Sequence, residues 1–420
     1  MEKQDHPVFR KLFRFILALG PGIFCIGYTI GTGSVTAMIK AGSQYGMQLL
    51  WVLALSTFFA GILMETYGRF AAVTGGTAVY SFKIHLKNGK FWAILVIIGV
   101  VMGQWSSLSG ILALTSNALY EVTRLFVPTL SEDNYWIILG IAILIILILY
   151  SLLWIGRYSF FEKLLIVFVA IMALSFIVSM FIVIPPAEEI VRGFIPSIPV
   201  NGHLMVAAFV GTTMAAPTFI VRPLIVKEKG WKKENMKEQT RDAIFSASLM
   251  FVISVVIMIS ATGALFHKEL SVNRVLDMVT ALEPVAGRFA IAIFMIGAMS
   301  AGVSSIFPIL MVFPLLIGDY KKGTMDVKSK RFRILTGVAC LVGLIVPILG
   351  TNPILAQIAT QVANVFILPV VIGGAIILIN SKKLMGQHRA GTILNTGLVV
   401  ALIFALIISY TGILGLASLF

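Results

Sequence analysis

Long apolar runs separated by short polar segments occupy most of this 420-residue chain. Within the runs the apolar positions continue around the whole helix instead of following one face. A helix that is apolar on all sides lies in a membrane or in a large core, and a membrane span needs about 20 apolar residues. We therefore predict eleven membrane-spanning helices, at residues 14–45, 47–68, 92–120, 135–156, 163–184, 203–226, 243–265, 286–317, 332–350, 353–380 and 392–417.

Two of these spans, 14–45 and 203–226, contain sequences that interrupt a helix. The first includes GTGSVT from Gly31 onward, and the second includes MAAP followed by Pro223. A Pro inside a helix costs about 3 kcal/mol and a Gly about 1 kcal/mol, although membrane helices also tolerate simple kinks. If the first ten spans form two inverted repeats, the broken helices occupy corresponding positions, where carriers place their central site.

The interrupted spans and the long hydrophobic pattern define our expectation for the fold. We predict an all-α integral membrane protein with a 5+5 inverted repeat and broken helices 1 and 6. The whole chain, 1–420, is expected to be one transmembrane transporter domain, with repeats at about 14–184 and 203–380 and an extra helix at 392–417.

The positive charge of the chain follows its predicted topology. Charged residues make up only 12% of the sequence, about half the share in a soluble protein, and the net charge is +14. Most Lys and Arg fall on one side of the predicted spans, as the positive-inside rule requires of the cytoplasmic side. We therefore expect a multi-pass protein of a prokaryotic cytoplasmic membrane, with the N-terminus cytoplasmic and the C-terminus outside, and no nucleic-acid partner.

Ionisable side chains are scarce within the predicted spans. Among the acids only Glu65 lies in a span, where Arg69 follows at i+4 as a local ion-pair partner; the five His lie at termini, loops or span ends. Proton-coupled carriers use intramembrane acids or His, and transition metals take carboxylate, imidazole or thiolate ligands. Cys25 and Cys340 are expected to be small apolar fillers. We therefore expect no metal site and no cofactor.

Several segments resemble the NRAMP divalent-metal transporter family (natural resistance-associated macrophage protein). The similarity runs through GPGIF…AGSQYGMQLLWVL in the first two helices, RFAAVTG from Arg69, LIVKE after the sixth span, and TQVANVFILP from Thr360. The resemblance covers most of the chain. It implies a LeuT-type fold of eleven or twelve helices, with the substrate site between helices 1 and 6.

The residues that bind metal in that family are replaced here. The family sequence DPGN falls on GTGS, so that Gly31 takes the place of the metal-binding Asp and Ser34 that of the Asn. The family sequence MPH falls on AAP, which puts Ala215 and Pro217 in place of the Met and the His. The family's second His falls on Arg222, and its helix-3 acids fall on Ser106 and Ser109. This divergent member therefore retains the scaffold and Gln361, but lacks the metal-ligand motifs.

Hydroxyls and amides are the polar groups that remain around the predicted site. Amides both donate and accept hydrogen bonds, and an indole offers an apolar face with one donor, which together suit a neutral, hydroxyl-rich solute. The leading hypothesis is a secondary transporter for a small uncharged polar solute, with a sugar such as glucose first, working as a uniporter by alternating access. The predicted substrate-binding residues are Tyr28, Thr29, Thr32, Ser34, Gln104, Trp105, Thr212, Thr213, Thr218, Gln361 and Asn364.

The remaining predictions concern helix breaks, gating and coupling. Gly31, Gly33, Ala215 and Pro217 are expected to break helices 1 and 6. Arg222 either reaches the membrane interface or closes an inner gate with an acid such as Glu65, next to Arg69. Ser304 and Ser305 are candidate sodium ligands.

Alternatives to the uniporter also remain open. They are transport of Mn²⁺ or Mg²⁺ by a divergent site, sodium-coupled symport, a channel, and a sensor that binds without transport. An enzyme is not expected, because no predicted base lies near a buried Ser or Thr nucleophile. The expected partners are a small-molecule solute and the lipid bilayer, and the expected state is a monomer.

Overall fold

The computed structural model describes residues 21–127, 129–131, 134–155, 158–266 and 275–417. Within these ranges ten helices are long and apolar enough to cross a membrane, and the bent pair Pro21–Thr29 with Gly33–Tyr45 makes an eleventh candidate span. The prediction of about eleven spans is thereby confirmed. Residues 14–20 of the first predicted span lie outside the described part of the chain.

The first half of the chain supplies the helices up to the loop before the sixth span. They are α2 (Pro21–Thr29), α3 (Thr32–Tyr45), α4 (Leu50–Thr74), α5 (Ala78–His85), α6 (Gly89–Phe126), α7 (Tyr135–Leu153), α8 (Tyr158–Ile182) and α9 (Ala187–Arg192).

The second half begins with the other broken span and includes two short 3₁₀ helices. Its elements are α10 (His203–Thr213), α11 (Ala216–Glu228), η1 (Lys233–Asn235), α12 (Met236–Leu265), α13 (Val275–Lys322), α14 (Lys330–Gly343), α15 (Ile345–Leu349), α16 (Pro353–Ala363), α17 (Leu368–Asn380), α18 (Lys382–Met385), η3 (Gly386–His388) and α19 (Thr392–Ala417).

Local sequence explains where several helices begin and end. The side chain of Asn134 accepts a hydrogen bond from the Ile137 amide at the start of α7, and Asn352 accepts one from Ile354 at the start of α16. Such side chains satisfy amide groups that have no partner in the first helical turn. Helix α4 ends at Gly75, whose φ of 64° is left-handed, a conformation that glycine adopts without steric cost.

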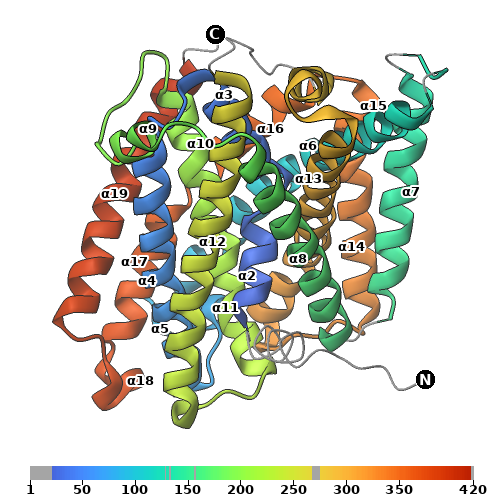
Figure 1. Ribbon diagram of the computed structural model, residues 1–420. Coiled ribbons are helices and arrows are strands. Elements are labelled where there is room, and N and C mark those ends of the chain that lie inside the picture. Colours follow the sequence, from blue (N-terminus) through green and yellow to red (C-terminus); the bar gives the residue numbers. More distant parts are fainter. Residues whose placement is uncertain (1–20, 128, 132–133, 156–157, 267–274, 418–420) are drawn as a thin grey trace, which may run out of the picture.

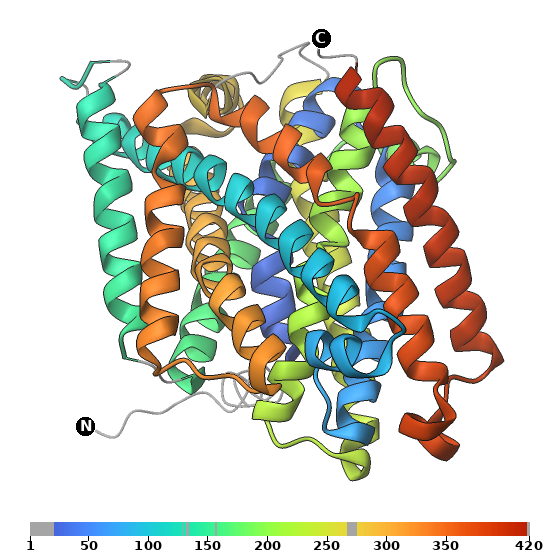
Figure 2. The ribbon, with the colours of Figure 1, turned by 180° about the vertical axis from the view of Figure 1, so that it is seen from behind.

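The broken helices lie at the centre of the bundle. Figure 1 shows α2 in the middle, with α19 and α7 at opposite edges, and Figure 2 shows α6 crossing the bundle obliquely. Helix α12 packs against α3 and α4, α13 packs against α6 and α8, and α10 packs against α16 and α19. The first and sixth spans are therefore enclosed by the remaining helices.

Two features of the fold were not predicted from the sequence. The tenth span is divided into α16 and α17 by a turn at residues 364–367. The expectation that Glu65 is the only acid within a span was wrong, because α12 begins at Met236 and includes Asp242, and α13 extends through Asp319. Both carboxylates are buried, at 4% and 0% exposure.

Asp319 has a structural explanation within the described part of the chain. Its carboxylate accepts hydrogen bonds from the main-chain N–H groups of Val79 at 3.0 Å and Tyr80 at 3.3 Å, and from the hydroxyl of Thr77. These donors form the N-terminus of α5, where a negative charge is favourable. Asp319 therefore joins α13 to α5 by acting as the cap that α5 lacks in its own sequence.

Candidate substrate site

A small cavity lies where the two broken spans meet. Its volume is about 20 Å³, close to the space that one water molecule needs. Helices α6, α13 and α16 complete its wall. The lining residues are Tyr28, Thr29, Gly31, Gly33, Ser34, Gln104, Ser107, Ile111, Thr212, Ala215, Ser305, Ile309 and Gln361.

The break between α2 and α3 is connected to the sixth span by hydroxyl groups. Because α2 ends at Thr29, its main-chain carbonyl is free to accept from the hydroxyls of Ser34 and, at 3.5 Å, Thr212. The hydroxyls of Thr29 and Thr218 are 3.3 Å apart, and those of Ser34 and Thr212 are also in contact. Helix-end carbonyls need such partners when they are buried.

Glycine is required at the first break because other elements approach its backbone closely. Gly31 lies in extended conformation, with φ −104° and ψ −174°, and a Cβ at this position would overlap the hydroxyl of Ser305. A Cβ at Gly33 would overlap the side-chain amides of Gln357 and Gln361. The two glycines thus let α13 and α16 reach the cavity.

The second break is made by an extended residue between α10 and α11. Ala215 has φ −56° and ψ 115°, and Pro217 is the second residue of α11. Pro is tolerated in the first turn of a helix because its missing N–H would have no partner there. Ala215 therefore lies at the predicted break, and Pro217 lies just after it.

A row of hydrogen-bonded side chains joins α6 to the broken tenth span. The amide of Gln104 donates to Asn364 at 2.8 Å, and Asn364 donates to Gln361 at 3.1 Å. The amides of Gln357 and Gln361 both donate to the hydroxyl of Ser107, each at 2.9 Å. Since Ser107 accepts twice, its own O–H proton stays available to the cavity that it lines.

One buried hydroxyl at the cavity has no protein partner within the described residues. The phenol oxygen of Tyr28 is buried and makes no hydrogen bond, while Tyr28 lines the cavity. Buried polar groups are normally paired, so an unpaired one at a cavity wall is a candidate contact for a substrate. Gln357 Oε1 and Thr213 Oγ1 are also buried without a partner, but neither residue lines the cavity.

The predicted substrate-binding residues differ in how close they lie to the cavity. Six of the predicted binding residues line the cavity, and they are Tyr28, Thr29, Ser34, Gln104, Thr212 and Gln361. Thr218 and Asn364 lie one contact behind it, through Thr29 and Gln104. Trp105 stacks edge-on against Phe313 instead. The side chain of Thr32 lies outside the described part of the structure.

Two polar residues were not predicted from the sequence: Ser107, which lines the cavity, and Gln357, which donates to Ser107 from behind it. Ser107 follows Gln104 at i+3, a spacing that places both side chains on one helix face. If Gln104 lines the site, Ser107 is therefore expected there before Trp105, which is adjacent to Gln104 and lies on another face. Gln357 precedes Gln361 by four residues and belongs to the same face of α16. Their common hydrogen-bond partner is the signal that only the folded chain reveals.

The two candidate sodium ligands have different environments. Ser305 donates to the carbonyl of Gly27 at 2.9 Å and lies 3.5 Å from that of Tyr28. Ser304 donates to Ala301 within its own helix. Of the two, only Ser305 lies where carbonyls of α2 and a hydroxyl of α13 meet.

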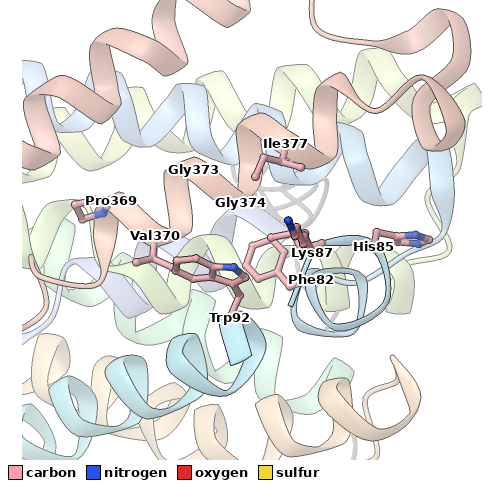
Figure 3. Close-up of a pocket in the computed structure, with 10 residues that line it drawn as sticks. Phe82, His85, Lys87, Trp92, Pro369, Val370, Gly373, Gly374 and Ile377 are labelled. Carbon is pink, nitrogen blue, oxygen red and sulfur yellow. The ribbon is translucent and has the colours of Figure 1, made fainter. Parts of the chain in front are cut away.

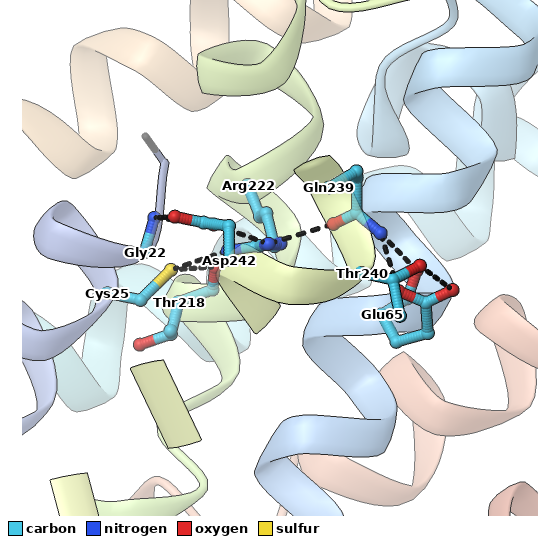
Figure 4. A network of polar contacts seen from close by, with 8 residues as sticks. All are labelled: Gly22, Cys25, Glu65, Thr218, Arg222, Gln239, Thr240 and Asp242. Carbon is cyan, nitrogen blue, oxygen red and sulfur yellow. Dashed lines mark hydrogen bonds and ion pairs between the residues drawn. The ribbon is translucent and has the colours of Figure 1, made fainter. Parts of the chain in front are cut away.

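A network of buried polar groups lies at the start of α2 (Figure 4). Arg222 of α11 donates to Asp242 and to Gln239 of α12, each at 2.8 Å. Asp242 also accepts from the main-chain N–H of Gly22 at 3.0 Å, and Arg222 lies 3.8 Å from the sulfur of Cys25. The network thus links α2, α11 and α12.

Glu65 enters this network through Gln239. The Gln239 amide donates to Glu65 at 2.6 Å, and Arg69 forms an ion pair with the same carboxylate at 2.6 Å. The predicted local pair of Glu65 and Arg69 is therefore present. The predicted reach of Arg222 to the membrane interface was wrong, since Arg222 is 0% exposed, and its acidic partner is Asp242 instead of Glu65.

The groups around the cavity are neutral. None of its described lining residues is Asp, Glu, His or Cys, and no cluster of three such residues occurs among the described residues. Ligands of this kind are the ones that Mn²⁺ and other transition metals take from proteins. Hydroxyls, amides and helix-end carbonyls remain, and they suit neutral polar solutes or hard cations.

Comparisons of the sequence place the chain among known membrane proteins. A family model described as "Natural resistance-associated macrophage protein-like" matches residues 22–415. A divalent metal cation transporter MntH of Vibrio campbellii is 24% identical over 394 residues, covering 91% of this chain and 88% of the relative. A natural resistance-associated macrophage protein 2 homolog of Dictyostelium discoideum is also 24% identical over 393 residues, which cover 88% of this chain but only 59% of that longer protein.

Solved structures give the same fold. A manganese transporter of Eremococcus coleocola aligns over 99% of this chain and 89% of its own, with a TM-score of 0.76 at 14% identity. MhsT, solved in complex with L-phenylalanine, aligns over 96% of this chain and 98% of its own, with a TM-score of 0.65 at 16% identity. The expected LeuT-type transporter architecture is thereby confirmed. With its family match spanning residues 22–415 and this architecture, the chain belongs to the Nramp family of membrane transporters.

Proposed function

We propose that this Nramp-family transporter carries a small uncharged polar solute through the cavity between its broken helices. The observation that carries the proposal is the neutral donor set of that cavity, in which hydroxyls, amides and helix-end carbonyls replace charged or sulfur ligands. Such groups hydrogen-bond to a hydroxyl-bearing solute without the cost of burying an unpaired charge. A sugar such as glucose is the member of this class that we propose to test first.

The size of the cavity requires a conformational step. About 20 Å³ holds one water-sized group, so a sugar enters only after the two half-helices move apart. Alternating access provides such a movement in carriers built from broken helices. The buried pair Arg222 and Asp242, which ties the start of α2 to α11 and α12, is the gate that we assign to this movement.

Transport is proposed to run without proton coupling. The carboxylates of Glu65, Asp242 and Asp319 are each held by hydrogen bonds to neighbouring groups, and none of the three residues lines the cavity. A solute could then move down its own gradient. Sodium coupling through Ser305 and the carbonyl of Gly27 is the alternative mode for the same substrate class.

A divalent cation is the second candidate substrate. The relatives with printed activities are divalent metal cation transporters, and a volume of about 20 Å³ has room for an ion before any opening. Mg²⁺ and Ca²⁺ accept oxygen ligands of the kind found here, including carbonyls and water. Mn²⁺ would lack the imidazole, thiolate or carboxylate ligands that such metals usually take.

Binding to the purified protein distinguishes the two candidates. Thermal unfolding is followed with glucose and other monosaccharides, with Mn²⁺, and with Mg²⁺, because a ligand that binds the native state raises its stability. The proposal predicts a concentration-dependent rise with a sugar and none with micromolar Mn²⁺. A rise with micromolar Mn²⁺ and none with any sugar would establish the second candidate.

A further inference from the structure

A second, larger pocket lies apart from the central cavity, between the turn from α5 to α6 and the helix α17 (Figure 3). Its volume is about 560 Å³. The residues that line it are Phe82, His85, Leu86, Lys87, Trp92, Pro369, Val370, Gly373, Gly374 and Ile377. The transport mechanism above uses none of them.

One part of this pocket is apolar and faces outward. Ile377 is 55% exposed and Trp92 is 37% exposed, and α17 belongs to the candidate membrane span Gln357–Asn380. Exposed apolar surface on a spanning helix meets lipid. A Cβ at Gly373 would meet no atom within 4 Å, so the glycine leaves open space along the helix where a hydrocarbon chain fits.

The other part of the pocket is positively charged. Figure 3 shows Lys87 beside the helix that carries Gly373, Gly374 and Ile377, with the His85 ring directed away from it. Burial lowers the pKa of His85, and the positive charge of Lys383 lowers it further, so the positive charge at this rim comes from lysine side chains and not from the imidazole. None of the described lining residues is acidic. The rim therefore complements a negative charge.

We propose that this pocket binds one anionic phospholipid. Lys87, with Lys383 nearby, faces the phosphate, and an acyl chain lies along Val370, Gly373 and Ile377. Basic pockets between membrane helices recognise anionic head groups, and Trp is favoured where head groups meet hydrocarbon, the setting that Trp92 provides. A free phosphate would use the charged rim but leave the apolar wall without a partner, so the proposal commits to a lipid.

The test uses the full-length protein in detergent and native mass spectrometry. The probes are phosphatidylglycerol, phosphatidylcholine and inorganic phosphate. We expect retention of one phosphatidylglycerol at least about fivefold tighter than phosphatidylcholine, the effect of about one lysine at a membrane surface. Equal retention of the two lipids would refute the requirement for a negatively charged head group. Retention of inorganic phosphate as strong as that of phosphatidylglycerol would refute a lipid as the occupant.

Two variants separate the head-group contact from the acyl contact. Lys87→Gln removes charge without filling the pocket, and Gly373→Leu fills the open space without removing charge. Each is expected to lower phosphatidylglycerol binding about fivefold or more, while Lys90→Gln, an exposed lysine outside the lining set, leaves it unchanged. Unfolding temperatures identify any variant that has lost its fold. Unaltered lipid binding in both folded pocket variants would refute the assignment.

Discussion

Arg222 and Asp242 form an ion pair at 2.8 Å in which the two side chains are 0% and 3% exposed. The same carboxylate accepts the main-chain N–H of Gly22 at 3.0 Å, so one buried pair fixes the start of α2 to both α11 and α12. Removing a single partner of such a pair leaves an uncompensated charge. Movement of α2 away from α11 and α12 therefore requires this contact to break.

The first prediction concerns the accessibility of Cys25. Arg222→Ala should lower stability by about 3–5 kcal/mol and release α2, so that Cys25, which is 0% exposed, becomes reactive. The rate of alkylation by N-ethylmaleimide measures this. All variants also carry Cys340→Ala, so that Cys25 is the one cysteine that can react, because the chain has only two cysteines.

Two matched variants separate gating from general destabilisation. Arg124→Ala breaks the pair of Arg124 and Glu121, at 2.9 Å, without touching α2, and should leave Cys25 protected. Arg222→Met with Asp242→Asn removes both charges of the pair and should recover much of the stability while Cys25 stays reactive. Unchanged alkylation in folded Arg222→Ala protein would remove the gate from the account.

The second prediction concerns the glycine at the first break. Gly31→Ala should abolish uptake, because the new Cβ would overlap both the hydroxyl and the Cβ of Ser305. Gly27→Ala in the same broken span is the control, since its Cβ meets Leu165 at 3.4 Å and Val169 at 3.5 Å, which are ordinary contacts. Uptake into proteoliposomes measures both, and equal uptake by the two variants would contradict the assigned role.

The third prediction compares two tyrosine hydroxyls. Tyr28→Phe should leave stability unchanged, because its hydroxyl has no partner among the residues that the structure describes, and should raise KM about fivefold through one lost hydrogen bond to solute. Tyr67→Phe removes a bond to the carbonyl of Val371 at 2.7 Å and should cost about 1 kcal/mol of stability with KM unchanged. Kinetics and thermal unfolding of both proteins test this, and an unaltered KM in Tyr28→Phe would exclude the contact.

The fourth prediction concerns coupling. Uptake should be the same with and without a proton or sodium gradient, since the account assigns transport to the solute's own gradient. If uptake instead requires sodium, Ser305→Ala should abolish that requirement, because Ser305 donates to the carbonyl of Gly27. Ser304→Ala should leave the requirement unchanged, because Ser304 donates within its own helix. A sodium requirement that survives Ser305→Ala would exclude both modes.

The spans and the helix breaks could be predicted from the sequence because their causes are local. Apolar length identifies a membrane helix. Gly31 and Ala215 lie where the helices break, and Gly33 lies just after the first break. The division of the tenth span at residues 364–367 was not foreseen, since Asn364 lies in a stretch without Gly and before the apolar residues of α17.

The partners within the site could not be predicted in the same way. Asp242 follows a charged segment that resembles a loop, and only the fold shows that α12 starts at Met236 and brings this acid to Arg222. Which face of α6 meets the cavity depends on the rotation of the helix against its neighbours. For that reason Gln104 was identified, Ser107 was missed, and Trp105 was included although it packs against Phe313.

The central claim is that the neutral cavity carries an uncharged solute. Its most direct test is uptake into proteoliposomes of radiolabelled glucose and other monosaccharides beside Mn²⁺ and Mg²⁺, with protein-free vesicles as the blank. We predict saturable sugar uptake that is lost in Gly31→Ala and retained in Gly27→Ala, with no uptake of micromolar Mn²⁺. Saturable metal uptake with no sugar uptake would contradict it and assign the hydroxyls and carbonyls of the two helix breaks to a cation.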